Sequence, residues 1–289
     1  MGDFSREWLA LREPFDHGAR CVRLTQTLRR HFQDRGGQPL RVVDLACGRG
    51  SNLRYLAPRL PGPQRWLLVD QDPELLADAP GAGWMRSVTV EHMQADLRQG
   101  FDQLPGDIDL VVASALLDLA SEGWLEGLAA FCRRRQLPLL AALTVDGRIR
   151  WNPPHPLDPY VDRHFKAHQL GDRGFGPSPG WQATRRINDR FVQGGFSVLT
   201  APADWQIGSI HRQMLSEMAR GIAGAAAEMS PNGRVVRHWR DERLRQIEAG
   251  VASLMVGHLD LLALPPVRLQ RTQQRRQRVP QRAYVADQV

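Results

Sequence analysis

The chain has 289 residues, of which 42% are hydrophobic and 24% are charged. This is the composition of an ordinary soluble domain, and a chain of this length can bury a core without disulfide or metal crosslinks. No apolar run reaches the roughly 18 residues that span a bilayer, so we expect no association with a membrane. The three cysteines are widely spaced, and the charged N-terminus lacks the apolar stretch of a secretion signal. We therefore expect a cytoplasmic protein without a metal site.

The positive charge is concentrated at the C-terminal end. The formal net charge is +7, but residues 268–289 hold six arginines and one acid, which leaves the first 267 residues close to neutral. Such a run either extends into solvent or attracts an acidic partner such as nucleic acid. Because it lacks the interleaved aromatic residues that stack on bases, we expect a flexible tail.

The chain begins with helices and continues as an alternation of strands and helices. Over residues 1–36, apolar side chains recur at helical spacing, with breaks at Pro14 and Gly18. Short apolar runs then alternate with helical segments, which predicts a parallel sheet covered on both faces. The five strands predicted in this region are residues 40–45, 66–69, 88–90, 108–113 and 137–145.

The pattern is looser after residue 145. Residues 146–180 are rich in Pro, Gly, His and Asp, which predicts loops around a short helix. Two further strands are expected at 196–200 and 254–264, and between them residues 209–250 predict one or two helices. The sequence thus predicts an α/β fold with a doubly wound, seven-stranded sheet. Its expected parts are an N-terminal helical lid (1–36), a main domain (37–267) with a helical insertion (about 209–250), and a basic tail (268–289).

The most informative segment is the turn after the first strand, Asp44-x-Ala46-x-Gly48-x-Gly50. Glycines are needed where a ligand lies against the backbone, because a Cβ would collide with it. Twenty residues past Gly50 the second strand ends on Asp70, where an acid can accept both hydroxyls of a ribose. Nicotinamide and flavin dinucleotides bind to the same kind of geometry, so these features alone indicate only nucleoside binding. A dinucleotide fingerprint, however, needs a third glycine where this chain has Leu53.

The spaced acid and small residues closely resemble motif I of the class I S-adenosylmethionine-dependent methyltransferases. Three further motifs of that family are matched in order at 68–76, 94–97 and 109–114. The resemblance covers residues 40–145 and implies a Rossmann-like methyltransferase domain with S-adenosyl-L-methionine as cofactor.

The resemblance also implies which residues hold the cofactor. The turn through Ala46, Gly48 and Gly50 would lie against its methionine and ribose, Asp44 would reach its amino group, and Asp70 would bind the ribose. Gln71, Asp96 and the amide of Leu97 would surround the adenine, and Ser114 would lie beside the transferred methyl group. Arginine binds a carboxylate through two hydrogen bonds, so Arg12 and Arg20, in the polar stretch before the first strand, are candidates for the methionine carboxylate.

Acceptor residues are expected after the fourth and fifth strands, because ligands bind outside the carboxyl ends of parallel strands. Asp118 and His155 are the candidate catalytic groups, and a histidine there can take up a proton near neutral pH. We expect methyl transfer to a small-molecule acceptor. The alternatives are a nucleic-acid methyltransferase anchored by the tail and a non-catalytic protein that binds the cofactor. The acceptor and the oligomeric state cannot be read from the sequence.

Overall fold

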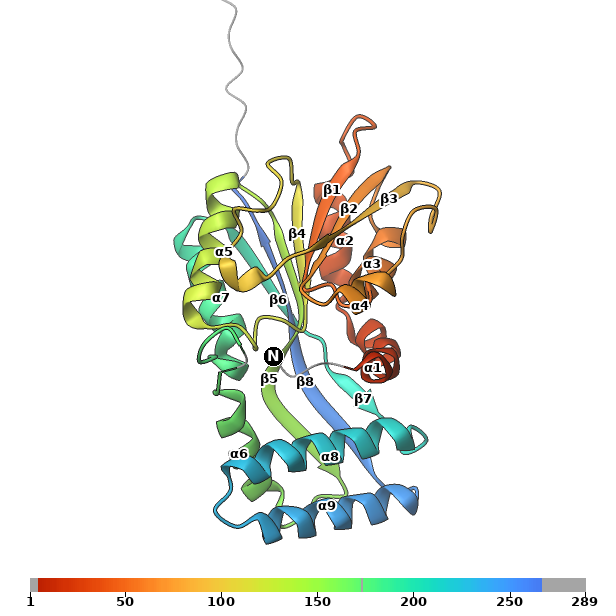
Figure 1. Ribbon diagram of the computed structural model, residues 1–289, viewed down its shortest axis with the longest axis vertical. Coiled ribbons are helices and arrows are strands. Elements are labelled where there is room, and N and C mark those ends of the chain that lie inside the picture. The colour runs from red at the N-terminus through yellow and green to blue at the C-terminus, as the bar shows by residue number, and fades with distance from the viewer. Residues whose placement is uncertain (1–4, 173, 267–289) are drawn as a thin grey trace, which may run out of the picture.

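The computed structural model describes residues 5–172 and 174–266, which form one mixed sheet with helices on both faces (Figure 1). The predicted tail, 268–289, lies outside the described residues. Seven strands follow the order β3-β2-β1-β4-β5-β8-β6, and β7 pairs with β8. The strands are β1 (Leu40–Leu45), β2 (Gln64–Asp70), β3 (Val88–Gln94), β4 (Leu110–Ser114), β5 (Leu139–Asn152), β6 (Ser197–Pro202), β7 (Trp205–Ile207) and β8 (Ser253–Leu264).

The sheet confirms the predicted fold class. Strands β1 to β5 are parallel, and β8 runs antiparallel between β5 and β6. All seven predicted strands are present, and the short β7 is the one addition. Strands β1 and β4 are buried at almost every position, as expected for a parallel sheet with helices on both faces.

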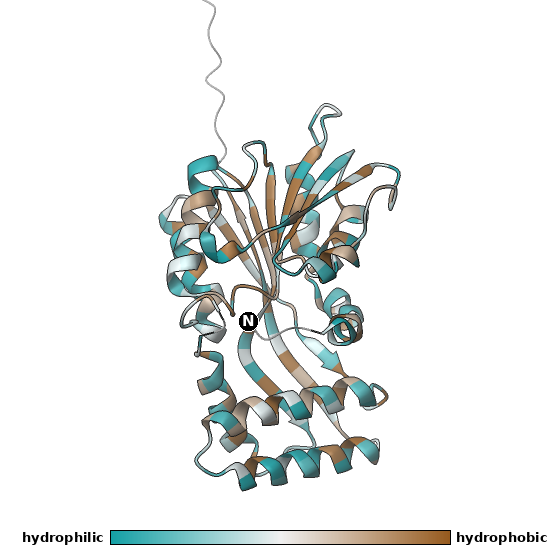
Figure 2. Ribbon diagram, viewed as in Figure 1, coloured by the Kyte–Doolittle hydropathy of each residue, from teal (hydrophilic) through white to brown (hydrophobic). Residues whose placement is uncertain are grey.

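Two hydrophobic layers enclose the sheet. On one face, α5 (Glu122–Arg135) and α7 (Ala183–Gln193) pack through residues such as Leu128 and Ile187. On the other face, α2 (Val22–His31) and α3 (Ser51–Leu56) pack through Leu28 and Leu53. Figure 2 shows the hydrophobic residues gathered in the strands between these layers. The other helices are α1 (Arg6–Ala19), α4 (Pro73–Ala77), α6 (Asp158–Gln169), α8 (Arg212–Met229) and α9 (Gly233–Glu248), with single 3-10 turns at Ala57–Arg59, Leu97–Gln99 and Gly180–Gln182.

Strands β5 and β8 continue beyond the rest of the sheet and carry a separate helical layer (Figure 1). The loops predicted from residue 146 are wrong as far as Asn152, because β8 supplies partners for residues 149–152 after a register shift. Helices α6, α8 and α9 surround this extension with a third hydrophobic cluster, which includes Trp151, Trp205 and Trp239. The predicted helical insertion is therefore two helices, with the break at 230–232.

The break predicted at Pro14 is also wrong. Helix α1 runs through Pro14 and ends at Ala19. The chain turns instead at Arg20, which is extended, and the following Cys21 N–H donates a hydrogen bond of 2.8 Å to Oδ2 of Asp260 in β8. A tertiary contact therefore sets the end of the helix, whereas the proline is accommodated within it.

The helical layer is built around one buried arginine. The guanidinium of Arg243 in α9 is fully buried and lies 4.9 Å from the ring centre of Trp151 and 5.8 Å from that of Trp239, two rings that pack edge to face. It donates to both carboxylate oxygens of Asp158, at 2.5 and 2.6 Å, and to the carbonyl of Pro153 at 2.7 Å. A buried, paired charge of this kind fixes the position of α9 against the start of α6.

We expect Arg243→Ala to lower the free energy of unfolding by about 3–5 kcal/mol, because it leaves Asp158 without its cation and removes a buried side chain that packs against two indole rings. Arg245→Ala, on the exposed face of the same helix, should change it by less than about 0.5 kcal/mol. Urea denaturation of the two variants measures the difference. Equal, small effects would show that the buried ion pair does not hold the layer.

Candidate functional site

The turn after β1 has the backbone conformation that the glycine pattern predicts. Ala46, Gly48 and Gly50 have φ angles of 51°, 52° and 74°, in the left-handed region that favours glycine. A Cβ at Gly50 would lie 2.7 Å from Cδ of Pro80, so glycine is required there by space as well. Ala46 tolerates the strained conformation and keeps a small side chain toward the cavity beside the turn.

Asp70 fixes this turn to the end of β2. Its two carboxylate oxygens accept hydrogen bonds from the N–H groups of Gly48, at 2.8 Å, and Asp72, at 3.0 Å. Burial raises the pKa of Asp70 above its usual value. Each carboxylate oxygen has a further lone pair, so Asp70 can hold the turn and still accept from a ligand hydroxyl.

Asp44 places an unpaired acceptor at the same site. Its Oδ1 accepts from the side-chain amide of Asn52 at 3.1 Å, whereas Oδ2 is buried and has no hydrogen-bond partner. Burial raises the pKa of Asp44 to about 7. A buried carboxylate oxygen without a partner beside a cavity is a site prepared for a ligand cation or N–H group.

Arg20 positions the carboxylate of Asp44 indirectly, through Asn52. Its Nη1 donates to the amide oxygen of Asn52 at 2.9 Å, and its Nε lies 3.5 Å from Oδ2 of Asp260. Arg20 is buried and is not among the residues that line the cavity. The prediction that it contacts the methionine carboxylate is therefore not supported by its position: it orients Asn52, and through Asn52 it orients Asp44.

A first cavity of about 130 Å³ lies between the glycine turn, α1 and the end of β4. Six of the predicted cofactor residues line it: Asp44, Ala46, Gly48, Asp70, Gln71 and Ser114. Gly50 shapes the turn without lining the cavity. Four residues of α1 also line the cavity, Leu9, Arg12, Glu13 and Asp16, and of these only Arg12 is a candidate named from the sequence.

Asp96 and Gln71 border a surface depression that adjoins the first cavity at Gln71. The carboxylate of Asp96 pairs with the side chain of Arg98 at 2.7 Å, which lowers the pKa of Asp96. Leu97 is buried and lines neither the cavity nor the depression, and its carbonyl accepts from the indole N–H of Trp124 at 2.8 Å. Two of the three residues predicted for adenine, Gln71 and Asp96, therefore border this depression.

A second cavity of about 440 Å³ adjoins the first, because Arg12, Ala115 and Leu119 line both. Its walls come from α1, β5, α6, α8 and β8 and are mostly apolar. The apolar lining residues are Trp8, Ala115, Leu119, Leu143, Val145, Ile149, Phe165, Trp205, Met218, Ile222 and Val256. The polar ones are Arg12, Asp118, Arg148, Gln169, Glu217 and His258.

Asp118 therefore lies where an acceptor residue was expected, whereas His155 does not. His155 lines neither cavity: its N–H donates to Asp158 at 2.8 Å and its Nδ1 accepts from the N–H of Leu157 at 3.1 Å, so it belongs to the turn that precedes α6. The sequence placed His155 in a loop after the fifth strand, but β5 continues to Asn152 and carries it away from the ends of the other strands. His164 and His168 line neither cavity.

His258 is the cavity residue that sequence reasoning missed. It is 2% exposed, lies opposite Val145 in the β5–β8 pairing, and packs against the ring of Trp205 with 4.8 Å between centroids. Burial lowers its pKa to about 4. A histidine within the mostly apolar run Leu254–Leu264, which also contains Asp260, was the available signal, but only the pairing of β8 with β5 places it at a cavity.

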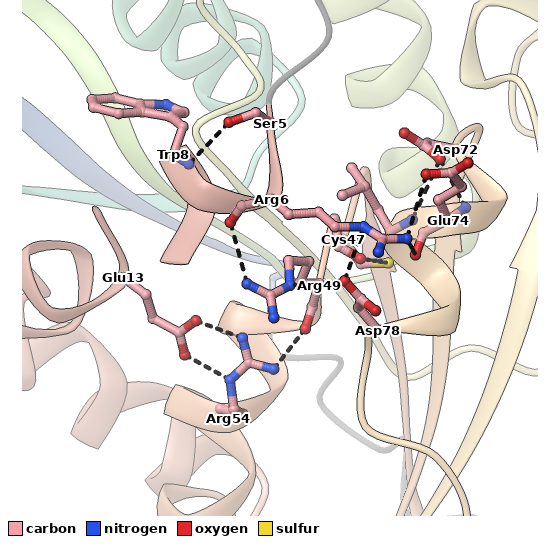
Figure 3. Close-up of polar contacts among 12 residues, drawn as sticks. Ser5, Arg6, Trp8, Glu13, Cys47, Arg49, Arg54, Asp72, Glu74 and Asp78 are labelled. Carbon is pink, nitrogen blue, oxygen red and sulfur yellow. Dashed lines mark hydrogen bonds and ion pairs between the residues drawn. The ribbon is translucent and has the colours of Figure 1, made fainter. Parts of the chain in front are cut away.

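Helix α1 covers the first cavity and is held by ion pairs (Figure 3). Arg54 in α3 donates to both carboxylate oxygens of Glu13, at 2.6 and 2.5 Å. At the other end of the helix, Arg6 lies 3.2 Å from Asp78 and 3.4 Å from Glu74. Contacts with α3 and the α4 region thus fix the helix over the glycine turn.

Within the described ranges, no group of three or more His, Cys, Asp or Glu side chains could hold a metal ion. None of the helices described is long and apolar enough to cross a membrane.

Comparison with known proteins finds a family match for the part of the chain that contains the glycine turn. Residues 42–135 match the family profile described as a methyltransferase domain. No curated protein matches the sequence significantly. Among solved structures, a cyclopropane synthase of Mycobacterium tuberculosis is 13% identical, with a TM-score of 0.45, over 91% of this chain and 87% of its own. A methyltransferase of Geobacter sulfurreducens, solved with S-adenosyl-L-homocysteine, is 16% identical, with a TM-score of 0.43, over 92% of this chain and 100% of its own. These likenesses are too distant to assign a substrate.

The ion pairs of α1 differ in burial, and this difference can be tested. Glu13→Gln should speed amide hydrogen exchange in 6–19 by roughly threefold to tenfold, because it weakens a partly buried, two-bond ion pair. Glu74→Gln should leave exchange in the same helix unchanged, since that pair is exposed and surface pairs contribute little. Exchange followed by mass spectrometry compares the two variants. Equal rates in both would rule out Glu13–Arg54 as the stronger attachment.

Proposed function

We propose that the chain is a class I S-adenosylmethionine-dependent methyltransferase that methylates a small, largely apolar molecule bound in the second cavity. The match of residues 42–135 to a methyltransferase-domain profile supports the activity. The observation that carries the proposal is the junction of the two cavities. Arg12, Ala115 and Leu119 belong to both, so a ligand in the first cavity and a ligand in the second would meet at these residues.

The first cavity fits S-adenosylmethionine. The unpaired Oδ2 of Asp44 suits the amino group, Asp70 suits the ribose hydroxyls, and Gln71 with Asp96 borders the space for adenine. When bound, the cofactor supplies an electrophilic methyl group on a positively charged sulfur. Five carboxylates line the cavity (Glu13, Asp16, Asp44, Asp70 and Asp72) against two arginines (Arg12 and Arg49), and this excess of acid favours a ligand that carries positive charge.

Arg12 suits the methionine carboxylate better than Arg20 does. It borders the cavity, and its guanidinium is oriented by two hydrogen bonds to Asp16, at 2.9 and 3.0 Å. The indole N–H of Trp205 donates to the same carboxylate at 3.1 Å, and the Arg12 guanidinium lies 4.9 Å from the centre of the Trp205 ring. Arg12 is thereby held in one position at the junction of the cavities.

The second cavity supports a small acceptor more than a nucleic acid. Its lining is dominated by aromatic and aliphatic side chains, and it is enclosed between β5, β8 and α8. Methyl transfer between two bound molecules depends on their alignment and on the exclusion of water. The apolar walls that α1 and α8 contribute to the second cavity favour both. The nucleic-acid alternative depends on residues 268–289, outside the described part of the chain. A non-catalytic protein would bind the cofactor without turnover.

Calorimetric titration of the purified chain tests the cofactor. We expect S-adenosylmethionine and S-adenosylhomocysteine to bind with micromolar dissociation constants and NAD to give no heat. Transfer of labelled methyl to a pool of small apolar acceptors then tests the activity. Binding of NAD alone would overturn the assignment of the glycine turn. Tight cofactor binding with no transfer to any acceptor would favour the non-catalytic alternative.

Asp44 should make cofactor affinity depend on pH. Its pKa is about 7 in the free protein, whereas a bound amino cation favours the ionised carboxylate. Binding below pH 7 must therefore release a proton, and affinity should fall about tenfold per pH unit between pH 7 and 5.5, where the ligand amino group stays protonated. Calorimetry in buffers with different ionisation heats measures the released proton.

Asp44→Asn is the control for this dependence. It should weaken binding by about 1–3 kcal/mol and abolish the proton release, because the amide does not titrate. Proton release that persists in the variant would assign the dependence to another group.

A further inference from the structure

Two hydrogen-bond acceptors at the second cavity have no partner among the residues that the structure describes. The side-chain oxygen Oε1 of Gln169, in α6, is buried and unpaired, and Gln169 lines the cavity. His258, in β8, lines it as well. Unpaired acceptors in an apolar cavity are costly unless the ligand supplies donors, so they indicate which chemical groups the ligand carries.

The ring of His258 is fixed in one tautomer. Its Nδ1 lies 3.1 Å from the carbonyl oxygen of Val256, and because a carbonyl only accepts, Nδ1 carries the hydrogen. Nε2 is then the nitrogen with the free lone pair. In the described part of the chain Nε2 makes no hydrogen bond, and it is not enclosed by protein, so it opens to the cavity that His258 lines.

The surroundings keep this histidine neutral. The Arg12 guanidinium of α1 lies 4.9 Å from the centre of the same Trp205 ring, and Arg148 of β5 pairs with both Asp146 and Asp204. The remaining charged groups that face the cavity are Asp118 and, on α8, the exposed Glu217. Burial outweighs the nearby carboxylates and lowers the pKa of His258 to about 4, so Nε2 is available as an acceptor throughout the neutral range.

The cavity walls suit a flat ring. Trp8, Phe165 and Trp205 contribute aromatic faces or edges, and Met218 adds an adaptable apolar surface. A volume of about 440 Å³ is within the range of cavities that enclose small organic ligands.

We propose that the second cavity binds a hydroxylated aromatic molecule whose hydroxyl donates to Nε2 of His258, and that Nε2 receives the hydroxyl proton as the oxygen is methylated. This inference rests on the proposed function and assigns its acceptor class. The O–H bond breaks, its electron pair stays on oxygen, and the proton forms an N–H bond at Nε2. The same oxygen forms the bond to the methyl carbon, whose bond to sulfur breaks with its electron pair leaving on sulfur.

A weakly basic histidine is adequate for this step. It does not ionise a phenolic hydroxyl in advance, because the pKa of a phenol is near 10. As the oxygen gives electrons to the methyl carbon, however, its proton becomes strongly acidic, and a neutral imidazole then accepts it readily. Arg12, beside the Trp205 ring, disfavours the resulting imidazolium and promotes release of the proton afterwards.

Binding of two matched probes tests the acceptor class independently of turnover. We expect the chain saturated with S-adenosylhomocysteine to bind 2-naphthol at least about tenfold more tightly than 2-methylnaphthalene, which has a methyl group in place of the hydroxyl. Because 2-methylnaphthalene is the more apolar probe, hydrophobic burial alone predicts the opposite order. The preference should be constant from pH 8 to pH 5, since His258 stays neutral in that range.

Two substitutions separate hydrogen bonding from proton acceptance. His258→Asn keeps a donor for the carbonyl of Val256 but removes the group at Nε2, so the preference for 2-naphthol should disappear. His258→Gln extends an amide toward the position of Nε2, so it should keep part of the preference and lose at least about a hundredfold in methyl transfer to 2-naphthol. Thermal unfolding and S-adenosylhomocysteine affinity confirm that each variant is folded.

The outcomes distinguish this inference from the function on which it rests. Failure of the wild-type chain to bind S-adenosylhomocysteine would overturn the proposed function. Normal cofactor binding with equal affinity for the two probes, or with no binding of 2-naphthol, would overturn the acceptor class alone. A His258→Asn variant that keeps both the preference and the methyl transfer would show that His258 only packs against Trp205.

Discussion

The arrangement of the site depends on one buried ion pair, between Arg20 and Asp260. Arg20 leaves α1 at the point where the chain turns, and Asp260 belongs to the antiparallel strand β8. The carboxylate of Asp260 also accepts from the backbone N–H groups of Cys21 and Leu143, at 2.8 and 3.0 Å. One side chain therefore joins the N-terminal helices, β5 and β8. Because these groups are almost completely buried, loss of either partner would leave an uncompensated charge in the core.

The same ion pair connects the two cavities. Through Asn52, Arg20 orients Asp44 in the first cavity. Through Leu143, Asp260 stabilises the irregular part of β5, where the register with β8 shifts and Leu143 adopts a left-handed conformation. Leu143 lines the second cavity. The geometry of the first cavity and the shape of the second thus depend on the same buried ion pair. We therefore expect a change in this pair to alter both cavities.

Much of the first cavity could be predicted from the sequence because its signals are local. A glycine or alanine at positions of positive φ, and an acid at the end of each of two neighbouring strands, lie within 27 residues between Asp44 and Asp70. Backbone sterics and strand order bring them together in any chain with this pattern. Arg20 was a different case. An arginine suits the methionine carboxylate of the cofactor, but Arg20 pairs instead with Asp260, which lies 240 positions later in the sequence.

The second cavity could not be predicted in the same way. His155 and His258 are both isolated histidines in the sequence, and His155, among prolines after a predicted strand, had the stronger local case. In the structure it is His258, and not His155, that lines a cavity, because β8 pairs with β5 far beyond residue 145. This pairing places His155 at the start of α6 and His258 opposite Val145. The sequence by itself determined the sheet, the glycine turn and the acids of the cofactor site, since these follow from local conformation and strand order. Only the tertiary structure decided which histidine lines the second cavity and which arginine lines the first, because both depend on contacts between segments more than a hundred residues apart.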